Sequence, residues 1–266
     1  MVPTTGSTWQ GIWIGTIGAE GVAVCFGKVN DNGARWSRYY YLRHGEMIPL
    51  VTTDSQGGIS PEDAEQKTTG SWTIDVGADG NLLGTWTSSE KDRSLPIHLS
   101  RVKLVANSEE SFWLKSDMCR SISFYRPLAE HAELVAGATK TDHGHRYRLI
   151  AMKHPLDADK NLVGPEADFV EIDGHDPGID AINHALRERY LNRLAKHYDK
   201  ETGGLGEFFE NVIGFTGKHV ILDEYEWAAG YGVSGITRWT ETWSLKTGKL
   251  IGRAEVKTGP DPEPDQ

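Results

Sequence analysis

The chain has 266 residues, of which 38% are hydrophobic, 25% are charged and nine are tryptophan; this composition is typical of a folded protein and not of a disordered one. Acidic residues outnumber basic ones 38 to 28, and the formal charge of −10 disfavours nucleic acid and anionic lipid as partners and favours a cationic partner. No stretch approaches the roughly 20 apolar residues needed to cross a bilayer, so we expect no membrane span. The length allows two domains, each with its own core.

The first part of the chain, from Trp9 to about Lys103, is a series of short β-like runs separated by Gly, Asn, Asp, Ser and Pro clusters. This spacing predicts an antiparallel β-meander that curls into a barrel or a sandwich. Residues 77–81, GADGN, are predicted to form a hairpin turn, because the Asp-Gly pair can adopt the positive φ angles of tight hairpins. The polar stretch 55–70 is predicted to be a loop.

We place a domain boundary near residue 125, where the character of the sequence changes. The predicted fold class is α+β: an antiparallel β-domain over 1–125, then an α+β domain over 126–256 with one long helix packed on an antiparallel sheet. The last residues, 257–266, are rich in proline and acidic residues and are predicted to form a disordered tail.

The long helix is predicted from Asp176 as a capping residue, Pro177 in the first turn and apolar residues that recur at helical spacing. GEFFENVIGF, at 206–215, is predicted to form a short second helix. The flanking runs HRYRLIAMK, ADFVEI, KHVILDEYEWAA, ITRWTETWSLK and LIGRAEV are predicted strands. In KHVILDEYEWAA the apolar residues change phase between Leu222 and Tyr225, which suggests a β-bulge.

Glycines at Gly230, Gly232 and Gly235 fit the G-x-G-x-x-G pattern of dinucleotide-binding loops. Such a site requires the glycines to open a helix, because the helix amino end holds the pyrophosphate. The segment that follows, GITRWTETW, alternates as a strand does. We therefore interpret the cluster as the tip of a β-hairpin, and no cofactor is predicted.

The remaining candidates for chemistry are weak, and we predict neither catalytic residues nor metal ligands. His143, His145, His154 and His175 are close enough in sequence to suggest a metal site, but a solvated polar loop is the simpler interpretation. The two cysteines, Cys25 and Cys119, form either one disulfide in an oxidising compartment or two buried thiols.

An acidic group near the end of the chain is open to two interpretations: the general acid and base of a glycosidase, or an acidic strand surface, which we favour. Together with two neighbouring tryptophans it forms our predicted partner-binding set. That set is Asp223, Glu224, Glu226, Trp239, Glu241 and Trp243.

The order of motifs DAINHALRERYLNRL, KHVILDEYEWAAGYGVSG and TETWSLKTGKLI, over about 180–252, resembles the C-terminal extracytoplasmic domain of RsiV-type anti-sigma factors and related bacterial envelope proteins. In that family an INxxL helix precedes a strand, a glycine-rich hairpin and a strand that ends in a DLKTGK turn. Here Ser244 replaces the acidic residue of that turn. The β-domain before it resembles an uncharacterised accessory domain of such proteins.

The resemblance implies an α+β domain outside the cytoplasm, in the periplasm or beyond, that binds protein, since RsiV-type domains recognise lysozyme. The start of the chain, MVPTTGSTW, shows no signal peptide, so this expectation rests on the resemblance alone. We expect a non-catalytic inhibitor or immunity factor that binds a cationic, wall-degrading enzyme. The alternatives are a hydrolase of wall glycans or peptides and a carbohydrate-binding β-domain.

Overall fold

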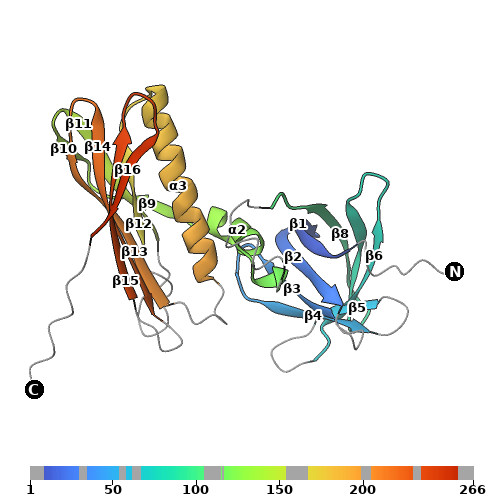
Figure 1. Ribbon diagram of the computed structural model, residues 1–266. Coiled ribbons are helices and arrows are strands. Elements are labelled where there is room, and N and C mark those ends of the chain that lie inside the picture. The colour runs from blue at the N-terminus through green and yellow to red at the C-terminus, as the bar shows by residue number, and fades with distance from the viewer. Residues whose placement is uncertain are drawn as a thin grey trace, which may run out of the picture. The chain divides into compact units, whose positions relative to one another are not determined.

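The protein is described here by a computed structural model (Figure 1). It describes residues 9–29, 35–53, 58–61, 67–104, 115, 117–153, 167–198, 205–229 and 235–256. The described chain is mostly β-strand, and it divides into two compact units, Met1–His131 and Ala132–Gln266. Each unit is considered by itself below.

The first unit contains a closed barrel of antiparallel strands that pair in sequence order, with the last strand pairing with the first. The strands are β1 (Gly11–Ile17), β2 (Glu20–Val29), β3 (Arg35–Tyr41), β4 (Ile48–Thr53), β5 (Gly58–Pro61), β6 (Gly70–Val76), β7 (Leu82–Ser88) and β8 (Ser94–Arg101). Inward side chains, among them Trp13, Phe26, Tyr39 and Trp72, fill the barrel with a single hydrophobic core. The predicted meander is confirmed, and it closes as a barrel.

One part of the predicted loop 55–70 is wrong, because Gly58–Pro61 forms strand β5. Ile59 is 1% exposed and faces Trp72 of β6, so this short polar segment contributes an inward apolar residue. Without it β4 and β6 would have no common neighbour. The predicted hairpin at 77–81 is confirmed, since Gly80 has a φ of 79° and the Gly77 amide donates to the Asn81 carbonyl at 2.7 Å.

A helical segment that the sequence did not reveal follows the barrel: the 3-10 helix η1 (Met118–Arg120) and the α-helix α2 (Ile122–His131). Pro127 lies inside α2, a position at which proline usually interrupts a helix. The Tyr40 hydroxyl of β3 donates to the Phe124 carbonyl at 2.6 Å. The segment thus belongs to the barrel unit, and the boundary that we predicted near residue 125 lies within α2.

A disulfide joins Cys25 of β2 to Cys119 of η1, and both cysteines are fully buried. Of the two alternatives that the sequence left open, the bridge is the correct one. It fastens the helical segment to the barrel across 94 residues of chain.

Replacing both cysteines, as Cys25→Ala with Cys119→Ala, should lower the free energy of unfolding of the barrel unit by about 4–5 kcal/mol, because a loop of this length greatly restricts the unfolded chain. Urea unfolding followed by tryptophan fluorescence measures the change. A loss below about 1 kcal/mol would show that the bridge does not restrain the unfolded state.

The second unit has two antiparallel sheets that meet at the parallel bridge between Ala167 and Phe208. The first sheet holds β9 (Leu134–Ala136), β10 (Lys140–Asp142), β11 (His145–Met152) and β12 (Asp168–Ile172); the second holds β13 (Leu205–Phe215), β14 (His219–Ala229), β15 (Gly235–Ser244) and β16 (Leu250–Glu255). The helix α3 (Pro177–His197) lies along one side of the strands (Figure 1). An antiparallel sheet with one long helix was predicted and is confirmed.

Helix α3 begins after Asp176, as predicted, although the Asp176 side chain makes no capping hydrogen bond. Its apolar stripe is buried, with Leu186 and Leu194 at 0% exposure. The side-chain amide of Asn183 fixes the helix to β12, because it accepts from the Ile172 amide at 2.9 Å and donates to the Ile172 carbonyl at 2.8 Å.

The predicted short helix at 206–215 is wrong: this segment is strand β13. Phe208 and Glu210 point toward α3 and are buried, whereas Phe209 between them faces the other way, which is the alternation of a strand. The bulge that we expected in β14 is also absent from its described register with β13 and β15; the irregularity lies in β13, between Val212 and Gly214. Glu224 of β14 is buried at an inward position where the alternating pattern would have an apolar residue, and this is why a bulge was expected.

Strands β14 and β15 are antiparallel neighbours, with Ala228 opposite Gly235. Gly235, the last glycine of the cluster, therefore begins a strand and not a helix, as predicted. The tip itself, 230–234, and the tail 257–266 lie outside the described residues.

Candidate functional site

The most unusual group of residues in the second unit is a set of buried charges between α3 and the second sheet. Glu210, Glu224 and Glu241 lie on β13, β14 and β15, and each side chain is 1% exposed. Glu210 is directly opposite Glu224, and Glu241 is opposite Leu222, which lies two residues from Glu224; the three carboxylates therefore share the face of the sheet that α3 covers. The balancing charges come from two arginines of α3 and one of β16. We refer to Arg189, Arg193, Glu210, Glu224, Glu241 and Arg253 as the Arg–Glu cluster.

Arg189 lies at the centre of the Arg–Glu cluster and contacts all three glutamates. Its Nε donates to Glu210 Oε1 at 2.9 Å, and its Nη1 lies 2.8 Å from both Glu224 Oε2 and Glu241 Oε1. One turn further along α3, Arg193 pairs with Glu224. Three guanidinium groups face three carboxyl groups, and such pairing lowers the cost of burying ionised carboxylates.

The open side of the cluster is closed by β16 and by two tryptophans. Arg253 Nη2 lies 3.1 Å from Glu224 Oε1, and its guanidinium stacks 4.4 Å from the Trp239 ring centroid. Trp243 donates its indole N–H to Glu241 Oε2 at 3.0 Å and is itself buried. The cluster thus ties α3 to all four strands of the sheet.

The charged groups of the Arg–Glu cluster differ in how the surrounding protein shifts their pKa values. Burial raises the pKa of Glu210 to about 7, and the nearby Arg189 and Arg193 offset only part of that effect. For Glu224, burial also acts to raise the pKa, but Arg189, Arg193 and a hydrogen bond from Arg193 outweigh it and leave the pKa below its ordinary value. The Arg189 guanidinium loses hydration, yet its three carboxylate neighbours raise its pKa.

The predicted partner-binding residues divide between the two faces of the sheet. Glu224, Glu241 and Trp243 are buried in or against the Arg–Glu cluster, so they present little surface to a partner. Glu226 and Trp239 are half-buried at its rim, and Glu226 lies 3.3 Å from Arg193.

Asp223, the sixth predicted residue, points away from α3, because neighbouring residues of a strand face opposite sides. It pairs with Arg238 at 2.6 Å. Around this pair is a surface that the sequence did not reveal, which we call the outer face: the side of β13–β15 opposite α3, with half-buried Phe209, Tyr225 and Trp227 and exposed Ile236 and Arg238. The sequence does contain a pattern that indicates this surface, since these aromatic residues alternate along their strands with the inward glutamates.

The cluster leaves its carboxylates poorly suited to hydrolysis. A glycosidase needs one carboxyl group that delivers a proton and a second that attacks or activates water, both in contact with substrate. Glu210, Glu224 and Glu241 instead direct their oxygens to guanidinium groups inside the protein.

The histidines do not assemble a metal site among the residues that the structure describes, where no group of three candidate ligands lies together. His143 Nδ1 bonds to Asp142 at 2.8 Å, and His145 stacks on Phe215 at 4.8 Å. His154 lies outside the described residues.

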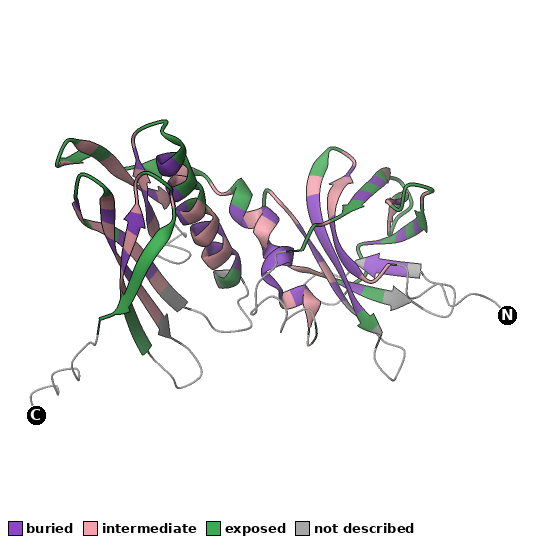
Figure 2. Cartoon of the chain, turned by 45° about the horizontal axis from the view of Figure 1, so that its top comes forward, coloured by how far each residue is buried: buried purple, intermediate pink, exposed green. Residues whose placement is uncertain are grey.

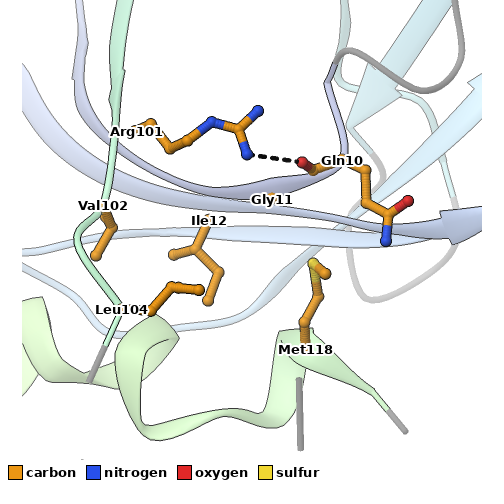
Figure 3. Close-up of a pocket in the computed structure, with 7 residues that line it drawn as sticks. All are labelled: Gln10, Gly11, Ile12, Arg101, Val102, Leu104 and Met118. Atoms are coloured by element: carbon orange, nitrogen blue, oxygen red, sulfur yellow. Dashed lines mark hydrogen bonds between the residues drawn. The ribbon is translucent and has the colours of Figure 1, made fainter. Parts of the chain in front are cut away.

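A pocket of about 240 Å³ lies in the barrel unit, between the start of β1, the segment after β8 and η1 (Figure 3). Arg101 donates to the Gln10 carbonyl at 3.2 Å and stacks on Trp13 at 4.6 Å, and Met118 faces it from η1. Among the described residues that line this pocket there is no carboxylate, histidine or cysteine.

Comparison of the chain with protein-family models, with curated proteins and with solved structures finds no match. Of the helices that the structure describes, none has both the length and the apolar character needed to span a membrane.

Replacing Arg189 with methionine keeps the volume of the side chain but leaves three buried carboxylates with one cation fewer. We expect Arg189→Met to lower the free energy of unfolding of the second unit by about 3–5 kcal/mol. Arg187→Met, at an exposed position of the same helix, is the matched control and should change stability by less than about 0.5 kcal/mol. Equal effects of the two variants in urea unfolding would contradict a central role for Arg189.

Because the pKa of Glu210 is higher in the folded state than its ordinary value of 4.5, the folded protein binds this proton more tightly than the unfolded chain does. Its contribution to stability is therefore present at low pH and is lost as pH rises from about 4.5 to about 7. Glu210→Gln should remove that loss and gain more than about 1 kcal/mol relative to the wild type between pH 5 and pH 8.

Urea unfolding at the two pH values measures the difference, and Glu207→Gln, on the same strand but outside the Arg–Glu cluster, serves as the control. If Glu210→Gln and the wild type differ in stability by the same amount at pH 5 and at pH 8, Glu210 does not titrate in this range.

Proposed function

We propose that this protein is a non-catalytic, exported bacterial protein that binds a cationic wall-degrading enzyme of the lysozyme type, as an inhibitor or immunity factor. The single observation that supports it most is the outer face, where Phe209, Tyr225 and Trp227 gather on a sheet whose other side is locked to α3. The rings of Phe209 and Tyr225 are 6.0 Å apart, and all three side chains are half-buried. Clustered aromatic anchors of this kind dominate protein–protein interfaces.

The charge of the second unit favours the same type of partner. Residues 132–266 contain 23 acidic and 16 basic side chains, a net charge of −7, whereas residues 1–131 contain 15 and 12. Most of the chain's net charge of −10 thus belongs to the unit that contains the outer face. A negative field of this sort accelerates encounter with a positively charged protein and weakens as salt is added.

The buried carboxylates support a binding function over hydrolysis. The glutamates that a hydrolase would need are held by arginines in the Arg–Glu cluster, which makes the sheet a rigid platform and leaves its outer face for recognition. The RsiV-type resemblance of residues 180–252 adds the lysozyme-type partner to this picture. The disulfide between Cys25 and Cys119 fits an oxidising compartment outside the cytoplasm.

The proposal predicts which tryptophan matters. Titration with a cationic lysozyme-type enzyme at low salt, followed by calorimetry, should give a complex that weakens at moderate salt. Trp227→Ala should weaken it about tenfold or more, because a central aromatic anchor is worth at least about 2 kcal/mol. Inhibition of wall lysis by the enzyme should decrease in parallel.

Trp239→Ala is the matched control, since Trp239 is also half-buried on the same sheet but faces the side of α3. It should leave the affinity unchanged once both variants are shown to be folded by circular dichroism. If Trp239→Ala alone weakens binding, the rim of the Arg–Glu cluster is the interface instead of the outer face. Absence of binding at both salt concentrations, over a panel of wall-degrading enzymes, would refute the proposed function.

A further inference from the structure

Strand β16 is an open edge of the second sheet. Within the described chain it pairs on one side only, with β15, and its other side has no strand partner. Every residue from Leu250 to Glu255 is exposed, and the strand that leads to the C-terminal trace is green along its length in Figure 2. Ile251 is 55% exposed and Val256 36%. Edges of this kind are usually protected, because their free backbone groups pair readily with another chain.

The backbone of β16 has a defined hydrogen-bonding direction. The Val256 amide donates to the Arg238 carbonyl of β15 at 2.8 Å, so the backbone groups of Val256 point inward to the sheet. Successive residues of an antiparallel strand alternate in this direction. Arg253 and Glu255 therefore direct their N–H and C=O groups toward the open side.

A bulge limits the regular part of this edge. Gly252 is opposite Thr242, but the next paired residue is Leu250, opposite Trp243, which leaves Ile251 without a partner on β15. Such an extra residue bends the strand and interrupts its ladder. The regular run is accordingly 252–256, and its central residue is Ala254.

We propose that β16 pairs antiparallel with β16 of a second copy of this chain, about a two-fold axis at Ala254, so that two sheets join into one. This register uses the whole regular run. It places Arg253 opposite Glu255 of the second copy, and the symmetry repeats the pair. Since both residues direct their backbone groups outward, they form narrow hydrogen-bonded pairs, with four backbone hydrogen bonds in total.

Charge complementarity selects the second copy and this register. A shift of two residues in one direction brings Arg253 opposite Arg253 of the second copy, and a shift in the other direction brings Glu255 opposite Glu255 of the second copy. Both shifted registers are disfavoured, because like charges directly opposite one another are destabilising. Glu255 makes no ion pair with any residue that the structure describes, whereas Arg253 already contacts two glutamates of the Arg–Glu cluster. The second copy thus supplies Glu255 with a cation.

The dimer can be tested on the full-length protein alone, so the result is independent of the proposed partner. Sedimentation over a concentration series should show a reversible monomer–dimer equilibrium for the wild type. Glu255→Arg, which opposes two arginines in each pair, should raise the dimer dissociation constant about tenfold or more. Glu20→Arg, an identical charge change at an exposed position of the barrel unit, should leave it unchanged.

Cysteine cross-linking tests the register. In Ala254→Cys the two thiols meet at the axis, where opposite Cβ atoms are about 4.5–5.5 Å apart, and mild oxidation with diamide should yield a covalent dimer. Thr240→Cys, opposite Ala254 on β15, should not cross-link, because three strand spacings, about 14 Å, separate the two copies. The native cysteines are buried in their disulfide and do not compete.

A wild-type protein that remains monomeric at the highest concentration, with no cross-link in Ala254→Cys, would overturn the inference. So would a dimer that Glu255→Arg leaves intact and that Ala254→Cys does not trap, because association would then use another surface.

Discussion

The second unit depends on the neutralisation of three buried carboxylates by Arg189 and its neighbours. An ionised glutamate in a protein interior is costly unless a cation and hydrogen bonds replace its lost hydration. The Arg–Glu cluster meets this condition only when α3 lies at one position along the sheet and at one rotation about its own axis. Hydrophobic packing alone would tolerate small displacements of the helix, whereas paired charges at 2.8 Å do not.

Much of the fold follows from local patterns, and the failures have physical causes. Period-two alternation indicated the barrel strands, and helical periodicity indicated α3. The prediction of a helix at 206–215 was wrong because Glu210 occupies a buried position of β13 where an apolar residue would have shown the alternation of a strand. Glu224 occupies a buried position of β14 in the same way, so the alternation of β14 was interpreted as a bulge. A single sequence does not show that a distant arginine neutralises an inward glutamate, since Arg189 and Glu241 are 52 residues apart. The candidate site was therefore only partly predictable: strands β14, β15 and β16 were found, whereas strand β13 and the division between the two faces of the sheet were not.

The two faces of the second sheet differ in the side chains that they carry. The inner face carries the charges that fix α3, and its residues have little freedom to change. The outer face carries half-buried aromatic side chains, and under the proposed function substitutions there would alter recognition. The acidic residues singled out from sequence thus belong mainly to the architecture, and the neighbouring aromatic residues to the proposed interface.

The closure of the barrel by β1 and β8 has a consequence for how the chain folds. Trp13 of β1 pairs with Arg101 of β8, so the barrel closes only after the last strand has formed. Contacts between residues so distant in sequence carry a large loop-closure cost and make folding slow. Until then the apolar lining of the barrel is accessible to other chains. The bridge between Cys25 and Cys119 spans 94 residues of this unit, so once formed it limits how far the barrel strands can separate.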